Sequence, residues 1–301
     1  MVDGIVLGRA GGRYRVFADA TEREATLRGR MKHERGATVL VGDRVGLALH
    51  PDGGATIEVV RDRRSVLRRR SPGRSHGTRA IAANIDRVVV IGAARSPGWD
   101  PGLIDRFTAV AEANQLPALV VVNKADLDPD ALTLGEPYRR AGYEVLITSV
   151  PSRLGIPELG NRLRGCVSLF TGPTGAGKSS LLNALVPGLR LRTGEVSRRS
   201  GAGRHTTVAV EMHALGDDGF VVDTPGLRDI GLWGLAPLEV AAAFPEFTDL
   251  ASGCRFDNCR HRGEPGCEVV AAAQRGEIAA TRLASYRQLL EEAELAAKPW
   301  G

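Results

Sequence analysis

Two motifs in this chain carry the residue types that bind a nucleoside triphosphate. Residues 172–179 read Gly-Pro-Thr-Gly-Ala-Gly-Lys-Ser and fit the pattern G-x-x-x-x-G-K-[ST]. In loops of this pattern, backbone N–H groups surround the phosphates while the lysine ammonium reaches the terminal ones. Residues 123–126 read Asn-Lys-Ala-Asp. An aspartate carboxylate accepts both the ring N1–H and the exocyclic amino group of guanine, and adenine offers no matching donor pair. Together the motifs predict that the chain binds GTP.

The order of these motifs is the reverse of the usual one. In ordinary GTPases the phosphate loop comes first and the guanine-reading run comes last, whereas here residues 123–126 precede residues 172–179. This order predicts a circularly permuted G domain. The joint occurrence of both motifs at the ends of expected strands favours a nucleotide site over a chance match of either pattern.

The segments downstream of the phosphate loop supply candidate magnesium ligands. Residues 198–208 are rich in Gly, Ser and Arg and contain Thr207, whose hydroxyl we expect to bind Mg²⁺ from a mobile loop. Ser179 is expected to be the direct hydroxyl ligand. An apolar strand at 220–222 leads into Asp223-Thr224-Pro225-Gly226. There the carboxylate is expected near the metal, directly or through water, and the glycine N–H near the γ-phosphate.

Hydrolysis needs a group that orients the attacking water. Ras-like enzymes place a glutamine directly after this glycine, and this chain has Leu227 there, which cannot hydrogen-bond to water. His205, in the expected mobile loop, is the best candidate on chemical grounds. The alternative is that its imidazole contacts RNA or solvent. Lys178 and Thr207 are expected to assist catalysis through the phosphates and the metal.

A cluster of soft and borderline metal ligands lies near the C-terminus. Cys254, Cys259, His261 and Cys267 have the spacing C-x4-C-x-H-x5-C. Three thiolates and one imidazole suit a closed, tetrahedral structural zinc site. A disulfide is the alternative, but it is disfavoured in a cytoplasmic protein and leaves one cysteine over. The remaining cysteine, Cys166, lies in an apolar run and is expected to be a buried small hydrophobe.

The N-terminal segment has five short runs rich in Val, Ile, Leu and Thr, separated by glycine turns. This pattern predicts a small β-barrel such as an OB-fold. The expected strands are residues 4–9, 13–18, 24–30, 44–49 and 55–60. A basic linker rich in Ser, Gly and Pro follows, and it predicts a domain boundary near residue 71.

The charge of the N-terminal segment suggests a polyanionic partner. Residues 1–79 carry 17 Lys or Arg against 9 Asp or Glu, a net charge of +8, whereas the whole chain is +5. This distribution favours RNA as a partner, with a solvated basic surface as the alternative. Tyr14 and Phe17 are the only aromatic residues of the expected barrel. Arginine contacts to phosphates are therefore expected rather than base stacking, and the two aromatics are alternatively core residues.

The middle of the chain alternates valine-rich runs with helical stretches. Such alternation predicts a parallel sheet covered by helices, with the motifs at the carboxyl ends of the strands. The expected strands are residues 88–91, 118–122, 143–147 and 166–170, and the expected helices are 101–114, 135–141 and a segment after 156. A last helix over 278–297 is expected to close the C-terminal domain through Leu283, Tyr286, Leu289, Leu290 and Leu295.

The sequence has no apolar run of about 18 residues and no basic-then-apolar leader. We therefore expect a protein of the cytoplasm with no membrane span.

The series of motifs resembles the RsgA family of ribosome small subunit-dependent GTPases over essentially the whole chain. It consists of Asn-Lys-Ala-Asp, the phosphate loop, Gly203-Arg204-His205-Thr206-Thr207, Asp-Thr-Pro-Gly-Leu-Arg, Gly231-Leu232-Trp233 and the cysteine cluster. One departure is that Ser149 is followed by Val150 where a Ser-Ala pair is usual.

The resemblance implies a multidomain fold and a set of site residues. The fold is an N-terminal OB-fold at 1–70, a circularly permuted α/β P-loop GTPase domain at 71–234 and a mainly helical zinc-binding domain at 235–301. It also points to His205 as the catalytic histidine. With the motifs above, the expected nucleotide-binding residues are Asn123, Lys124, Asp126, Ser149, Gly172, Pro173, Thr174, Gly175, Ala176, Gly177, Lys178, Ser179, Ser180, Asp223 and Gly226.

The activity implied is GTP hydrolysis to GDP and phosphate with Mg²⁺, stimulated by the small (30S) ribosomal subunit during its late maturation. The implied partners are that subunit and its 16S rRNA, with one structural Zn²⁺ and a monomeric chain. A second hypothesis is an RNA-binding assembly scaffold that holds GTP without useful turnover. A permuted GTPase of the large subunit is a third, and the barrel and cysteine cluster argue against it.

Overall fold

The computed structural model describes residues 1–29, 38–70, 78–186, 188–191, 210–216, 218–223 and 235–297. The chain divides into two compact units, and each unit is built from three separate segments of the chain. The first unit is Met1–Asp86, Leu163–Leu169 and Val196–Leu227, and the second is Arg87–Arg162, Phe170–Glu195 and Arg228–Gly301.

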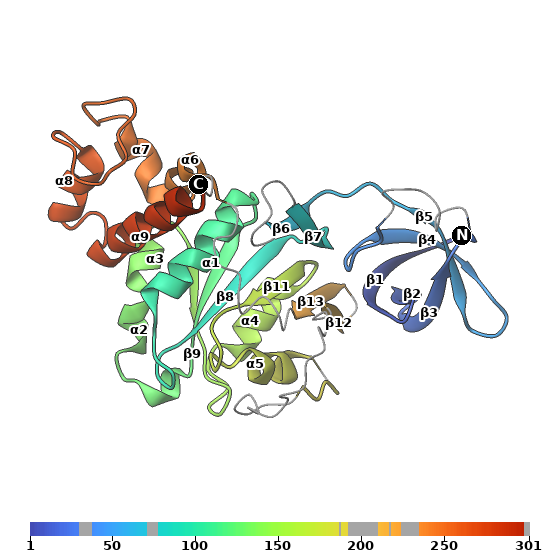
Figure 1. Cartoon of the computed structure of the whole chain (residues 1–301). Helices are drawn as coiled ribbons and strands as arrows, with labels where there is room; N and C mark the ends of the chain where they lie inside the picture. Colours follow the sequence, from blue (N-terminus) through green and yellow to red (C-terminus); the bar gives the residue numbers. More distant parts are fainter. Residues whose placement is uncertain are drawn as a thin grey trace, which may run out of the picture. The chain divides into compact units, whose positions relative to one another are not determined.

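Five strands of the first unit close into a barrel, as the glycine-punctuated apolar runs predict (Figure 1). The order around the barrel is β1-β2-β3-β5-β4. The strands are β1 (Val2–Ala10), β2 (Arg13–Ala18), β3 (Thr21–Leu27), β4 (Arg44–Leu49) and β5 (Ala55–Val60). Their inward positions form an apolar core that includes Val16, Leu47 and Ile57. Tyr14 belongs to this core, so the alternative interpretation of that residue is confirmed.

A second β-structure in the first unit lies where the composition predicts a linker. Strands β6 (Val66–Arg70) and β7 (Thr78–Ala83) pair antiparallel across the segment that the Arg, Ser, Gly and Pro content marks as a boundary. The side chain of Asn84 accepts a hydrogen bond from Arg64 N–H and donates one to the Gly42 carbonyl, both within 2.9 Å. The Asn84 side chain therefore links this segment to the backbone at Gly42, a contact that the composition of the segment does not reveal.

The barrel packs on a hairpin of the same unit. Strands β12 (Glu211–Leu215) and β13 (Gly219–Asp223) pair antiparallel. The ring of Phe17 lies edge-on to that of Phe220 at 5.6 Å between centroids, and Arg15 donates to the Met212 carbonyl at 3.4 Å. Phe17 thus has an aromatic partner outside the barrel. Strand β12 has no counterpart among the strands expected from sequence.

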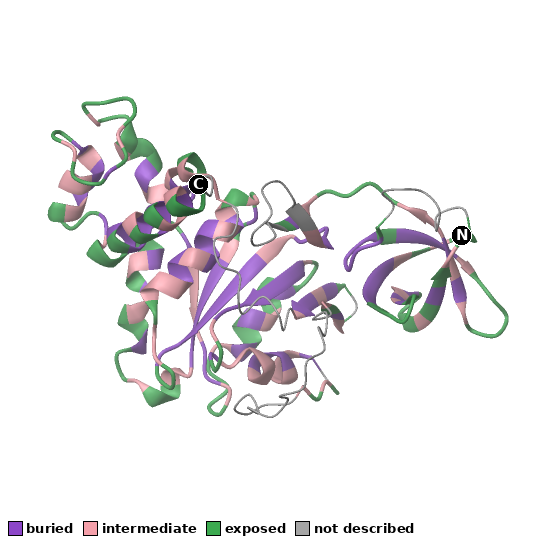
Figure 2. Cartoon of the chain, in the orientation of Figure 1, coloured by how far each residue is buried: buried purple, intermediate pink, exposed green. Residues whose placement is uncertain are grey.

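The nucleotide motifs lie on a six-stranded sheet with the order β10-β9-β8-β11-β13-β12 (Figure 1). Strands β8, β9 and β10 are parallel, as expected from their valine-rich runs. Figure 2 shows that β8 and β9 are largely buried. The remaining bounds are β8 (Arg87–Ala93), β9 (Ala118–Asn123), β10 (Glu144–Ile147) and β11 (Val167–Thr171).

Short helices of the second unit connect these strands. The expected helix 101–114 is α1 (Pro101–Ala113), which Asp100 caps by accepting a hydrogen bond from the Leu103 N–H at 3.1 Å. Aspartate is a preferred residue at this position because its carboxylate satisfies an N–H that has no partner within the helix. The others are η2 (Ala125–Leu127), α2 (Ala131–Leu134), α3 (Glu136–Arg140), α4 (Ile156–Leu163) and α5 (Lys178–Leu185).

The C-terminal helices share one apolar core with α1. The core includes Ala109 of α1 together with Val240, Phe244, Tyr286 and Leu289. The helices are α6 (Pro237–Ala242), η4 (Pro245–Phe247), α7 (Thr248–Ala251), α8 (Glu268–Gln274) and α9 (Ala280–Ala297). Helix α9 confirms the expected last helix, except that Leu295 is 59% exposed and lies outside the core.

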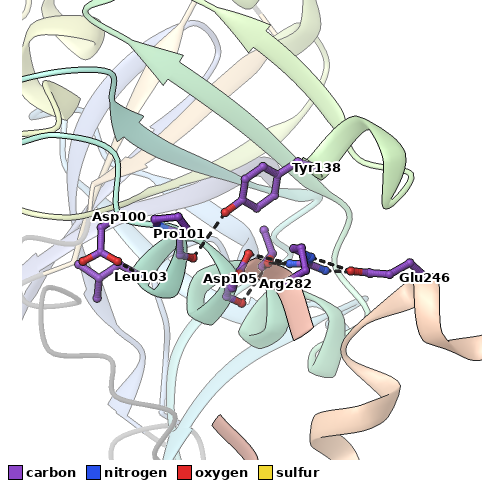
Figure 3. A network of polar contacts seen from close by, with 8 residues as sticks. Asp100, Pro101, Leu103, Asp105, Tyr138, Glu246 and Arg282 are labelled. Atoms are coloured by element: carbon purple, nitrogen blue, oxygen red, sulfur yellow. Dashed lines mark hydrogen bonds and ion pairs between the residues drawn. The ribbon is translucent and has the colours of Figure 1, made fainter. Parts of the chain in front are cut away.

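A buried ion cluster crosses this core (Figure 3). Arg282 of α9 is 1% exposed and donates to Asp105 of α1 at 2.8 Å and to both carboxylate oxygens of Glu246 at 2.7 and 2.9 Å. Its guanidinium also lies 4.5 Å from the ring centre of Phe244. Burial raises the pKa of Asp105, and the positive charge of Arg282 opposes that shift. The cluster binds the C-terminal helices to α1 by charge as well as by apolar contact.

No helix among the residues that the structure describes is long and apolar enough to cross a membrane.

Candidate nucleotide site and metal centre

The guanine-reading run and the phosphate loop meet in the second unit although they are about fifty residues apart. Asn123 ends β9 and is buried, and its amide donates to the Ala176 carbonyl of the phosphate loop at 2.9 Å. Thr148 donates from its hydroxyl to the Asn123 side-chain oxygen at 3.0 Å. These two contacts hold the Asn123 amide in one orientation. The guanine-reading run and the phosphate loop are therefore adjacent in space although their order along the chain is reversed.

Asp126 is held with its carboxylate toward solvent. The Ser149 hydroxyl donates to Asp126 Oδ1 at 2.6 Å, while Asp126 itself is exposed. Ser149 lies just after β10 and is fully buried, so the donor is rigidly placed. A second carboxylate oxygen stays available for a ligand, since a carboxylate accepts at both oxygens. That Asp126 reads guanine stays a prediction.

The phosphate loop has the backbone shape that an anion site needs. Gly172 and Gly177 both adopt positive φ, at 143° and 94°. A methyl group at Gly172 would lie 2.0 Å from the Ile91 carbonyl oxygen, and one at Gly177 would lie 2.3 Å from the Asn123 amide nitrogen. Only glycine fits at these two positions. The loop leads directly into the N-terminus of α5, where free N–H groups and the helix dipole favour a phosphate.

Lys178 begins α5 and folds back over its own loop. Its ammonium donates to the carbonyls of Gly172 at 2.6 Å and Pro173 at 2.8 Å. Ser179 and Ser180 follow in the first turn of α5 and are half-buried, and Thr174 and Gly175 are exposed at the loop tip. This loop can surround an anion with N–H groups and supply one ammonium and one hydroxyl beside it.

The structure describes one of the remaining predicted site residues. Asp223 ends β13 in the first unit. His205, Thr207, Gly226 and Leu227 lie outside the described residues. Their predicted roles in magnesium binding and water positioning stay predictions.

Two residues near this site were not singled out from the sequence. Thr148, next to Ser149, orients the Asn123 amide, and Ser96 accepts a hydrogen bond at its carbonyl from the Lys124 ammonium. A threonine at the end of a strand that precedes Ser149 is a signal that sequence reasoning could have used. The Ser96 contact has no such signal, because a backbone carbonyl accepts regardless of residue type.

The four predicted zinc ligands converge on one point. One ligand atom from each of Cys254, Cys259, His261 and Cys267 lies within 4.8 Å of all the others. In a tetrahedral zinc site, ligand distances of about 2.3 Å for sulfur and 2.0–2.1 Å for nitrogen separate sulfur from nitrogen by about 3.6 Å. The His261 Nδ1 atom lies 3.6 Å from Cys254 Sγ and 3.4 Å from Cys267 Sγ. The residues present therefore fit a zinc ion.

Neighbouring groups hold the loop between Cys259 and Cys267 in place. Glu264 accepts hydrogen bonds from the N–H groups of Arg260, Arg262 and Gly263 at 2.7–3.1 Å. Partial burial acts to raise the pKa of Glu264, but these donors stabilise the charged form and lower it to about 2. The Tyr286 hydroxyl of α9 donates to the Arg260 carbonyl at 2.8 Å. The loop is thereby preorganised by partners other than the metal.

Burial raises the pKa of Cys259 to about 12 and lowers that of His261. Thiols must lose their protons to bind zinc, so metal binding here is coupled to proton release.

Comparison with known proteins defines the family. The family model "RsgA GTPase" matches residues 60–233, which is more than half of the chain. The chain belongs to the RsgA GTPase family. A protein of Gemmatimonas aurantiaca named small ribosomal subunit biogenesis GTPase RsgA is 45% identical over 296 residues, covering 96% of each chain. One of Moorella thermoacetica with the same name is 41% identical over 292 residues, covering 97% of each.

Solved structures of similar fold agree with this assignment. The crystal structure of YjeQ from Thermotoga maritima is 31% identical and covers 99% of each chain with a TM-score of 0.80. The structure of YloQ, a circularly permuted GTPase, covers all of this chain with a TM-score of 0.76 at 23% identity, which supports the fold. The predicted permutation, the barrel and the C-terminal cysteine cluster are confirmed at the level of fold.

Proposed function

We propose that this chain is a GTPase that binds the small ribosomal subunit and uses GTP hydrolysis as a switch in the late maturation of that subunit. Two hydrogen bonds support GTP binding. The Asn123 amide bonds to the Ala176 carbonyl and so holds the guanine-reading run against the phosphate loop, and the Ser149 hydroxyl orients Asp126. The two named relatives carry the ribosomal part, since both are called small ribosomal subunit biogenesis GTPases.

Each site residue has a proposed role. Asp126 accepts hydrogen bonds from the guanine edge, and Lys178 with the surrounding loop N–H groups binds the β- and γ-phosphates of GTP or GDP. Ser179 and Thr207 offer hydroxyls to Mg²⁺, with Asp223 nearby and Gly226 toward the γ-phosphate. His205 positions water in place of the missing glutamine.

The proposed partner is the small subunit with its 16S rRNA, held in part by the basic N-terminal segment. We assign residues 1–70 to the RNA-binding barrel, 71–234 to the permuted G domain and 235–301 to the zinc-binding domain. One structural Zn²⁺ completes the chain, which acts as a cytoplasmic monomer.

Turnover assays with purified subunits test the proposal. Hydrolysis of GTP by the wild-type protein is expected to rise with small subunits and to stay at the basal rate with large subunits. GTP binding without turnover under either condition would favour the scaffold hypothesis. Stimulation by large subunits alone would assign the protein to the other subunit.

Base specificity is tested by the variant Asp126→Asn. The amide can pair with the 2-oxo group of xanthine, so the variant is expected to bind xanthosine triphosphate in preference to GTP. An unchanged GTP affinity would remove Asp126 from this role.

A further inference from the structure

A short segment between β8 and α1 touches both nucleotide motifs. We call residues 95–99, Arg-Ser-Pro-Gly-Trp, the β8–α1 strap. The Ser96 carbonyl accepts a hydrogen bond from the Lys124 ammonium of the guanine-reading run. The Pro97 ring lies over the tip of the phosphate loop, where a methyl group at Gly175 would be 3.2 Å from Pro97 Cδ. One strap therefore contacts the loop that reads the base and the loop that binds phosphate.

Both ends of the strap are anchored. Before it, the Ala94 N–H donates to the Asn123 carbonyl at 2.8 Å. At its end, the Trp99 ring packs on the backbone of β8, where a methyl group at Gly92 would lie 2.4 Å from Trp99 Cζ3. The Trp99 ring also lies edge-on to Tyr138 at 5.7 Å between centroids. Because both ends are held, the Ser96 carbonyl is placed before any ligand binds.

The contacted part of the strap adds little to the apolar core. Ser96 and Pro97 are both exposed, and so is Gly175, which Pro97 covers. An exposed ring over an exposed loop contributes little to folding. The position of these residues points instead to a role at the ligand site.

Lys124 is the group through which the strap acts. Its ammonium is held by Ser96, and its Cε lies 3.8 Å from the place where a methyl group at Gly177 would be. The methylene stem thus extends alongside the phosphate loop. When the ammonium of a lysine is held, its methylene chain forms a fixed apolar surface against which a flat base can pack. A lysine that is not held loses conformational entropy when the base binds, and this loss weakens binding.

We propose that the β8–α1 strap is a nucleotide-positioning element, in which the Ser96 carbonyl fixes Lys124 and the Pro97 ring supports the phosphate loop. This inference rests on the proposed function. The strap contacts the guanine-reading run at Lys124 and the tip of the phosphate loop at Gly175. Both parts of the site are proposed to hold GTP and GDP alike, so the strap strengthens the binding of the two nucleotides by the same factor. Its effect lies in the dissociation rate, since it preorganises the site rather than steering encounter.

The variant Pro97→Gly tests the role by freeing the strap and removing the ring. Stopped-flow release of fluorescent GDP and GTP is expected to be roughly threefold to tenfold faster for both nucleotides, the scale of one weakened charge-assisted hydrogen bond. Pro51→Gly, an exposed proline in the barrel turn between β4 and β5, is the matched control and leaves release unchanged. Both variants lose a proline that restricts the unfolded chain, so their melting curves should shift by the same small amount and overlay each other.

A double-mutant cycle separates positioning from packing. Lys124→Met keeps the stem and removes the ammonium, so Pro97→Gly should accelerate release by a smaller factor in that background, where only the contact of the Pro97 ring with Gly175 is left to lose. The same factor in both backgrounds, or an unchanged release rate in Pro97→Gly alone, would overturn the inference while leaving the proposed function intact. Absence of guanine nucleotide binding in the wild-type protein would refute both.

Discussion

Replacing Arg282 by methionine is expected to destabilise the second unit strongly. Methionine keeps much of the length and the contact with the Phe244 ring, so the main change is the loss of the positive charge. Asp105 is fully buried and one of its oxygens already lacks a hydrogen-bond partner among the described residues. Removing one partner of a buried ion pair costs about 3–5 kcal/mol because the other charge stays buried. For a unit of this size that corresponds to a fall of roughly 6–20 °C in melting temperature.

Thermal and urea unfolding of the full-length protein measure this effect, and Arg106→Met is the matched control. Arg106 also joins α1 to α9, through Glu292 at 2.7 Å, but the Glu292 side chain is 38% exposed. A partly exposed pair contributes at most about 1 kcal/mol. The two variants thus remove the same kind of contact between the same helices and differ in burial.

The pH dependence identifies the buried carboxylate as the cause. Burial raises the pKa of Asp105, and loss of Arg282 removes the charge that opposes this shift. A raised folded-state pKa means that the protonated folded form is stable at low pH and that stability is lost as pH rises through that pKa. The free energy of unfolding that Arg282→Met loses should therefore be smaller at pH 5 than at pH 8. Adding Asp105→Asn to this variant should recover part of the loss. Equal losses for both arginine variants, or a deficit independent of pH, would refute the reasoning.

Three further changes probe the sites. Ser149→Ala should weaken GTP binding by roughly threefold to tenfold in a titration, because Asp126 loses the donor that orients it; unchanged affinity would show that the hydrogen bond is not needed. Atomic emission is expected to find one zinc per wild-type chain and none in Cys259→Ser, whose C-terminal helices should be loosened; a metal-free wild-type protein with the same melting curve would contradict this. His205→Ala should keep GTP affinity and lose most of the hydrolysis stimulated by small subunits; stimulation equal to wild type would assign water positioning elsewhere.

Much of the fold could be predicted because its signals are local. The barrel strands follow from short β-branched runs between glycine turns, and the parallel strands from buried valine runs. Hairpin β6–β7 was missed because β6 is Arg-rich and the apolar run of β7 is short and made mostly of alanine, which is uncommon in strands. The two strands pair with each other across a polar segment. Strand β12 was missed because His213 and Glu211 interrupt its apolar residues, although Arg15 of the barrel donates a hydrogen bond to its Met212 carbonyl.

The candidate sites divide in the same way. The phosphate loop, the guanine-reading run and the cysteine cluster are each built from neighbours in sequence, so residue type and spacing are enough to identify them. The meeting of Asn123 with Ala176, the orientation of Asp126 by Ser149 and the strap over Gly175 join segments that are 23 to about 80 residues apart. Contacts of that kind depend on where strands end in the sheet and on backbone carbonyls that every residue carries.

Arg282 shows most plainly what cannot be predicted from the sequence alone. In the sequence it is one of many arginines on a helix with an apolar stripe, and nothing in its neighbours distinguishes it from a solvated side chain. In the folded chain it is 1% exposed, between Asp105 and Glu246. A charge can be buried only where opposite charges from distant segments converge on it, so its burial is decided by packing of α1, η4 and α9 rather than by residue type.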